Sequence, residues 1–68
     1  MVKIGDRYKE YMVPFPNEYF DWVYEVVELY TNKLGDFARC IQHYKDGKTE
    51  ECHICVELLT EGVFYTKI

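Results

Sequence analysis

Alternating apolar and polar positions divide the chain into short segments separated by turn-forming residues. The turn signals lie at residues 5–6, 14–17, 32–36 and 45–48, where Gly, Pro, Asn and Asp cluster. Several of the intervening segments are rich in aromatic and β-branched residues, a composition typical of strands. The pattern predicts a small domain built largely from short strands and turns.

The turn at Asp46-Gly47 predicts a β-hairpin with a two-residue loop, because this pair favours the positive φ that such a loop needs at both central positions. This loop pairs Lys45 with Lys48. Farther along the ribbon the same register gives these partners: Tyr44 with Thr49, Gln42 with Glu51, Cys40 with His53, and Ala38 with Cys55. A change of one residue in loop length would shift every partner.

The other side of this ribbon is mostly apolar and is therefore the expected core face. It carries Phe37, Ile41, Cys52, Ile54 and Val56. On this prediction Cys52 is a small core residue, whereas Cys40 and Cys55 lie on the opposite face.

Residues 17–34 fit two structures. On a helix, the acidic residues of this segment fall on one narrow stripe with apolar residues around most of the rest, Asn17 could cap the N-terminus and Gly35 could end the helix. Against a helix, the segment is rich in Trp, Tyr, Val and Thr, which favour strands. The local pattern leaves both structures open.

The order of the segments resembles the small SH3-like barrels encoded by phages and bacteria. The chain has the Gly5-Asp6 turn near its start, a strand-like Tyr24-Glu25-Val26-Val27-Glu28, a central hairpin, and a short segment before the last strand that fits a single helical turn, residues 57–61. The resemblance implies an all-β SH3-like barrel of about five strands with one short helical turn. The long connection at residues 14–21 and the acidic stripe depart from that pattern. They keep open an α+β alternative, with a helix at 17–34 packed on a small antiparallel sheet.

Length and composition predict a single folded domain. The 68 residues predict one domain over residues 1–68, and a hydrophobic fraction of 49% with a net charge of −4 is typical of a folded chain. The chain has no run of 18 apolar residues and does not begin like a secretory signal, so we expect a cytoplasmic protein.

The three cysteines and two histidines suggest a metal site at first sight. Cys40, His43, Cys52 and Cys55 follow the spacing C-x2-H-x8-C-x2-C. However, no Gly or Pro bends the backbone within either pair, and residues three apart on a strand point to opposite faces. We therefore expect no metal and no other cofactor, and an odd cysteine count argues against a complete set of disulfides.

Catalytic chemistry has little support. The chain has no Ser and no Gly-rich phosphate loop, since its glycines stand singly. Cys40 with His53 across the hairpin is the one nucleophilic pair that the predicted register offers. Such a pair needs a substrate pocket and a third group to orient the base, and a 68-residue barrel has little room for them. We expect a protein that is not an enzyme.

Acidic and aromatic residues point to binding instead. Seven Tyr exceed what so small a core needs, and Tyr is favoured at interfaces. Acidic side chains could meet a basic partner. The candidate binding residues are Tyr8, Tyr11, Trp22, Tyr44, Glu25 and Glu28.

We therefore expect a module that binds another protein. The resemblance implies a phage or mobile-element origin and, as the partner, a host or defence factor that the module binds or inhibits. Two alternatives stay open. One is a nucleic-acid-binding barrel that uses Lys3, Arg7, Tyr8 and Lys9, although the scattered basic residues argue against it. The other is a homo-oligomer that traps a small ligand between subunits.

Overall fold

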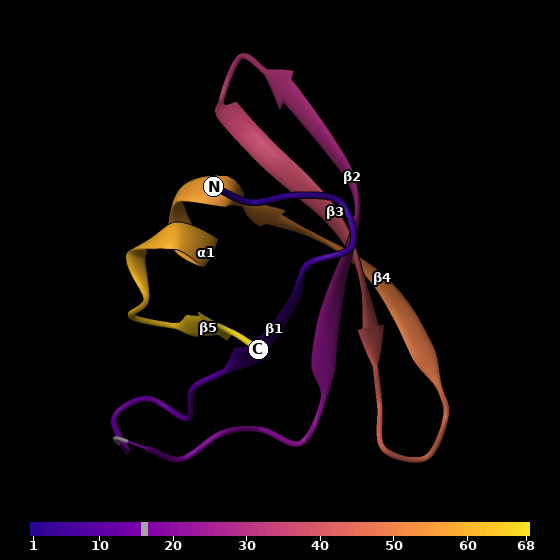
Figure 1. The fold of residues 1–68 in the computed structure, drawn as a ribbon, viewed down its shortest axis with the longest axis vertical. Coiled ribbons are helices and arrows are strands. Elements are labelled where there is room, and N and C mark those ends of the chain that lie inside the picture. The colour runs from indigo at the N-terminus through magenta and orange to yellow at the C-terminus, as the bar shows by residue number, and fades with distance from the viewer. Residues whose placement is uncertain (16) are drawn as a thin grey trace.

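The computed structural model of the protein describes residues 1–15 and 17–68. Its elements are β1 (Arg7–Glu10), β2 (Val23–Asn32), β3 (Gly35–His43), β4 (Thr49–Cys55), α1 (Val56–Glu61) and β5 (Tyr65–Lys67). The strands form one antiparallel sheet in the order β4-β3-β2-β1-β5. The sheet curls, and α1 connects β4 at one edge to β5 at the other (Figure 1).

The predicted all-β fold, with five strands and one short helical turn, is confirmed, and α1 covers the expected residues 57–61. The alternative helix at 17–34 is wrong, because β2 occupies most of that range. β2 pairs with β1 on one side and β3 on the other, and its alternation buries Tyr24 and Val26. Tertiary pairing of aromatic and β-branched residues therefore decides the structure of this segment.

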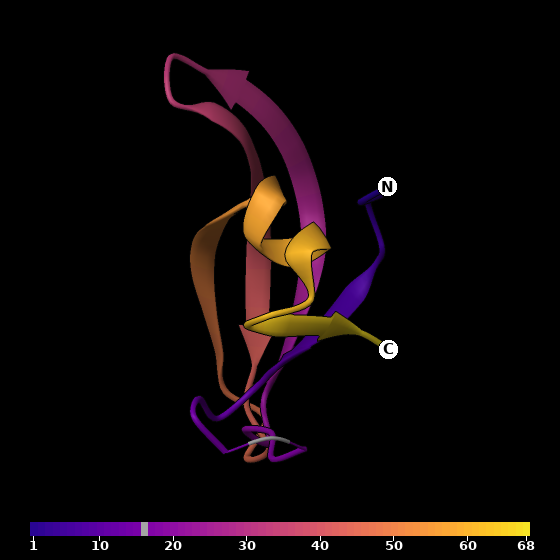
Figure 2. The same cartoon turned by 90° about the vertical axis from the view of Figure 1, so that its left-hand side faces the viewer.

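A β-bulge at Val27 bends β2, where the register with β3 shifts between Val26 and Glu28. Such an extra residue bends its strand and increases the local twist. The curvature of β2 is plain in Figure 2. The second half of β2 extends past β1, pairs with β3 alone and ends in an exposed turn at residues 32–35.

The turn between β3 and β4 is longer than the sequence predicts. The Tyr44 N–H donates to the Lys48 carbonyl over 2.9 Å, and the Gly47 N–H donates to the Tyr44 carbonyl over 3.0 Å. Of the residues in this turn only Gly47 has a positive φ, 91°, as in a three-residue loop that ends in a left-handed glycine. The Asp46 carboxylate accepts the Lys48 N–H over 3.0 Å, and this side-chain bond favours the longer loop.

The expected hairpin register is therefore wrong by one residue. The observed partners are Phe37 with Cys55, Ala38 with Ile54, Arg39 with His53, Cys40 with Cys52, Ile41 with Glu51, Gln42 with Glu50 and His43 with Thr49. A one-residue slip exchanges the two faces of a strand relative to its partner.

The slip changes which face of β3 is buried. The prediction placed Phe37 and Ile41 in the core and Cys40 outside it, and this was wrong: Ala38 and Cys40 are fully buried, whereas Phe37 and Ile41 are half-buried on the outer face. On β4 the predicted core face is confirmed, because Ile54 is buried and Cys52 packs against the core. Cys55 lies on the outer face, as expected.

The core lies between the inner face of the curled sheet and α1. Its buried apolar residues are Val2, Tyr8, Tyr24, Val26, Ala38, Cys40, Ile54 and Leu59. Leu59 comes from α1, so the helix closes the inner face that the strands leave open. In the described part of the chain, no helix is both long and apolar enough to cross a membrane.

Candidate functional site

The connection between β1 and β2 forms a loop whose two ends are held together. Tyr11 bridges to Tyr19, and their rings stack with centroids 4.9 Å apart. The Met12 N–H donates to the Glu18 carbonyl over 2.9 Å, and the Phe20 N–H donates to the Glu10 carbonyl over 3.0 Å. These contacts fix the base of the loop.

The tip of this loop exposes apolar side chains. Val13 and Phe15 are 58% and 62% exposed, and Pro14 is exposed between them. Asn17 adopts the left-handed region with φ 67°, which Asn tolerates better than most residues. A loop tip with this composition leaves apolar surface in contact with solvent.

A second segment, far away in the sequence, meets the loop. Gly62 ends α1 in the left-handed conformation, with φ 78°. The chain then turns so that the Tyr11 N–H donates to the Phe64 carbonyl over 2.8 Å. Val63 and Phe64 are 57% and 41% exposed, so this segment also leaves apolar side chains in contact with solvent.

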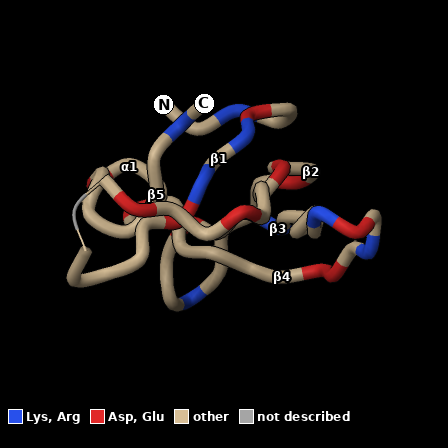
Figure 3. The backbone as a smooth tube through the Cα atoms, turned by 90° about the horizontal axis from the view of Figure 1, so that it is seen from below, with Lys and Arg blue, Asp and Glu red and all other residues tan. Residues whose placement is uncertain are grey.

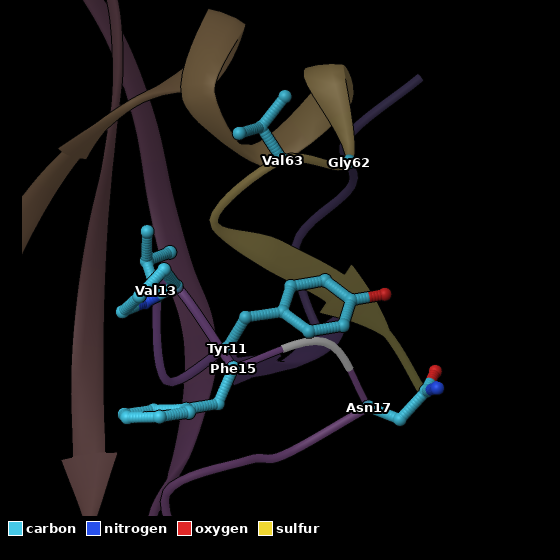
Figure 4. Close-up of a pocket in the computed structure, with 7 residues that line it drawn as sticks. Tyr11, Val13, Phe15, Asn17, Gly62 and Val63 are labelled. Carbon is cyan, nitrogen blue, oxygen red and sulfur yellow. The ribbon is translucent and has the colours of Figure 1, made fainter.

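The two segments enclose a hollow of about 390 Å³ that is open to solvent. It is lined by Tyr11, Val13, Pro14, Phe15, Asn17, Gly62 and Val63. In Figure 4 the Tyr11 ring crosses the middle of the view, with Val63 above it and Phe15 below. A mostly apolar hollow with an amide and a phenol at its wall has the character of a binding site.

Most carboxylates of the protein have a side-chain partner, and those that do not lie in the β1–β2 connection and in α1. Eight of the twelve Asp and Glu side chains form an ion pair or a hydrogen bond. Within the described residues, the four without a side-chain partner are Glu18, Asp21, Glu57 and Glu61. All four belong to the loop segment or to α1, and Glu18 and Glu61 each directly adjoin a residue that lines the hollow.

Basic residues are absent from the same two segments. No Lys or Arg occurs between Lys9 and Lys33 or between Lys48 and Lys67. In Figure 3 the tube around α1 is tan and red, whereas blue segments lie toward the chain ends and the hairpins. The unpartnered negative charge at the hollow therefore has no nearby basic residue in the sequence.

The predicted binding residues Glu25 and Glu28 lie on the outer face of β2, away from the hollow. There they belong to a hydrogen-bonded network. Glu25 accepts from His43 Nε2 over 2.9 Å, and Glu28 accepts from Arg39 Nε over 2.8 Å. Their charges are therefore largely engaged within the protein.

The same network extends to β4. Arg39 also donates to Glu51 over 3.1 Å, and the Tyr30 hydroxyl lies 2.7 Å from Nδ1 of His53. Contacts from His53 and from Arg39 hold the pKa of Glu51 below its ordinary value. Exposed pairs of this kind contribute little to stability, so this network is a solvated feature of the outer face.

The predicted residues Trp22 and Tyr44 are brought together, but they are half-buried. Trp22 stacks on Phe20 with centroids 4.4 Å apart and meets Tyr44 edge-on at 5.8 Å. The Trp22 indole N–H and the Tyr24 hydroxyl both donate to Glu10, over 3.1 and 2.7 Å. Tyr24 belongs to the core, and Trp22 packs against it.

Tyr8 was also predicted to bind, but it is 3% exposed and belongs to the core. Of the predicted aromatic residues, Tyr11 alone lines the hollow. Tyr19 is the most exposed of the seven tyrosines, at 41%, so the number of tyrosines alone does not locate a binding surface. The others are buried or half-buried, and several of their hydroxyl groups bond within the protein.

The Cys and His residues do not converge. Cys40 and Cys52 face the core, whereas His43 and Cys55 lie on the outer face. Among the described residues, no group of three or more His, Cys, Asp or Glu side chains could hold a metal ion. Cys40 and His53 point to opposite sides of the ribbon, so the pair considered for nucleophilic catalysis is not formed.

Val13, Phe15 and Val63 line the hollow but are not among the binding residues predicted from the sequence. The available signal was the apolar run around Pro14, because a proline-rich segment cannot pair into a sheet and must leave its apolar side chains in a loop. The contribution of Val63 depends on how α1 ends, which the local pattern does not specify. In comparisons with known proteins, no family model, no curated protein and no solved structure matches the chain.

Proposed function

We propose that the protein is a non-enzymatic module that binds another protein through the hollow and the carboxylates beside it. The observation that carries this proposal is the gathering of exposed Val13, Phe15 and Val63 around one hollow. Exposed apolar residues rimmed by polar ones are typical of protein interaction sites.

Within residues 1–15 and 17–68, the pair considered for nucleophilic catalysis does not assemble, and this supports a binding role. The thiol and imidazole considered for catalysis lie on opposite faces of the β3–β4 ribbon. Burial also raises the pKa of the Cys40 thiol to about 12, so this group is a protonated core residue at neutral pH. We propose that the module acts in the cytoplasm. On the SH3-like resemblance alone, we also propose that it is a phage or mobile-element protein whose partner is a host factor.

The nucleic-acid alternative has weaker support. Lys67, on β5 opposite Tyr8, adds a fourth basic residue to the three that this alternative names, Lys3, Arg7 and Lys9. However, Tyr8 is buried and cannot stack on a base. The proposal therefore places the partner at the acidic side of the molecule.

The test uses capture of a partner from a host lysate by the immobilised protein, with nuclease present. We expect the double variant Val13→Ser/Phe15→Ser to lose about tenfold or more in affinity for the captured protein, because exposed apolar side chains at the centre of an interface dominate binding. Both side chains are already exposed, so the melting temperature should hardly change. Quantitative pull-down and thermal melting measure the two effects.

Leu34→Ser is the matched control. Leu34 is 84% exposed and lies in the β2–β3 turn, at the opposite end of the molecule from the loop (Figure 1). Equal loss of binding in this control, or full binding by the double variant, would contradict the proposal. Capture that requires nucleic acid would favour the basic edge, and a small molecule that copurifies would favour the ligand-trapping oligomer.

A further inference from the structure

We propose that the occupant of the hollow is a short segment of the partner in which an aliphatic or aromatic side chain is flanked by Lys or Arg. This inference rests on the proposed function and specifies the chemistry of the partner. It is carried by the position of unpartnered carboxylates on both segments that enclose the apolar hollow.

The hollow provides the apolar half of the recognition. Tyr11 and Phe15 offer ring surfaces, and Val63 closes the other side. A volume of about 390 Å³ is at the lower end of the range for binding pockets. Because the hollow is open rather than enclosed, it suits one or two side chains of a chain that lies across it.

The carboxylates provide the charged half. Glu18 follows Asn17 on one wall, and Glu61 precedes Gly62 on the other. Both are exposed, and neither has an internal partner among the described residues. Carboxylates arranged in this way would meet a Lys or Arg on either side of an apolar anchor, and they would speed association at low salt.

The same charges disfavour the other occupants of such a surface. A nucleic acid and an anionic membrane would both bring negative charge to the unpartnered carboxylates. A second copy of this chain that met the hollow with its own hollow would bring these carboxylates against each other. A cationic segment with an apolar anchor satisfies both parts of the site.

The experiment begins with a displayed library of random peptides, selected on the immobilised full-length protein. We expect enriched sequences to combine an aliphatic or aromatic residue with flanking Lys or Arg. Enrichment of acidic or neutral sequences, of basic sequences without an apolar residue, or of none at all would overturn the proposal.

Charge reversal then tests the role of the carboxylates beside the hollow. The solution affinity of the most enriched peptide is compared in Glu61→Lys and Asp36→Lys, which change the net charge equally. Glu61 is the last residue of α1, where a Lys complements the helix dipole, so the fold should tolerate this change. Asp36 is exposed in the distant β2–β3 hairpin, where it accepts a hydrogen bond from Thr31. We expect about tenfold weaker binding for Glu61→Lys and less than about twofold for Asp36→Lys; equal effects would overturn the proposal.

This inference can fail separately from the proposed function. If Val13→Ser/Phe15→Ser loses the natural partner but the selected peptides carry no basic residues, the binding role stands and the cationic occupant is wrong. If the double variant keeps the natural partner, the proposed function itself fails.

Discussion

Replacing Cys40 by Lys is expected to abolish cooperative folding. Cys40 is fully buried at the centre of β3, and its cross-strand neighbours are Val26 and Cys52. An uncompensated charge there costs several kcal/mol. A single core in a domain this small rarely provides more than about 3–5 kcal/mol. Circular dichroism and urea titration should show a chain without a folded baseline.

Ile41→Lys is the matched substitution on the adjacent residue. Ile41 is half-buried on the outer face, and its cross-strand neighbours are Glu25 and Glu51. A Lys at this position gains two carboxylate neighbours, so we expect a loss of about 1 kcal/mol or less in the free energy of unfolding. If Ile41→Lys unfolds the protein and Cys40→Lys does not, the register of β3 with its neighbours is wrong.

Two of the three thiols, those of Cys40 and Cys55, are expected to react with alkylating reagents at very different rates. Cys40 is inaccessible in the folded state, whereas Cys55 is half-buried on the outer face. Modification of Cys40 therefore requires unfolding, and we expect it to be about a thousandfold slower than modification of Cys55. Mass spectrometry of alkylated peptides measures both rates. In denaturant the difference should disappear, and rapid labelling of Cys40 without denaturant would contradict its burial.

The same burial predicts how stability changes in alkali. Burial raises the pKa of the Cys40 thiol from 9.0 to about 12, and it also raises the pKa of Tyr8 and Tyr65. Below about pH 9 the thiol is protonated in both states and stability is unaffected. Above that pH the unfolded chain loses protons that the folded protein keeps, so the free energy of unfolding should fall between about pH 9 and pH 12. Labelling of Cys40 should accelerate over the same range.

Predictability from sequence differs between the fold and the hairpin register. The local composition of β2 is compatible with a strand and with a helix, and the order of the segments, through its resemblance to SH3-like barrels, leads to the correct fold class. The register of β3 with β4 depends on whether the loop at Asp46-Gly47 has two or three residues. Both loops use glycine, and the hydrogen bond from Lys48 to Asp46 favours the longer one. That single residue decides whether Cys40 or Ile41 lies in the core.

The candidate site is less predictable than the fold, because it depends on contacts between distant segments. Tyr8 and Trp22 look like surface aromatic residues in the sequence, yet the curled sheet draws both toward the core. Phe15 and Val63 look like ordinary apolar residues, yet the loop and the end of α1 leave them exposed. The bulge at Val27 and the left-handed Gly62 set these positions, and neither follows from hydrophobic alternation alone.

The central claim, that the hollow is the binding surface, is tested most directly by nuclear magnetic resonance. A ¹⁵N-labelled sample is titrated with the most enriched basic peptide, and the amide shifts are mapped on the chain. We predict that the largest shifts occur at Val13, Phe15, Asn17, Gly62 and Val63, with little change on the outer face. Shifts concentrated at Glu25, Glu28 and His53, with the hollow unaffected, would contradict the claim.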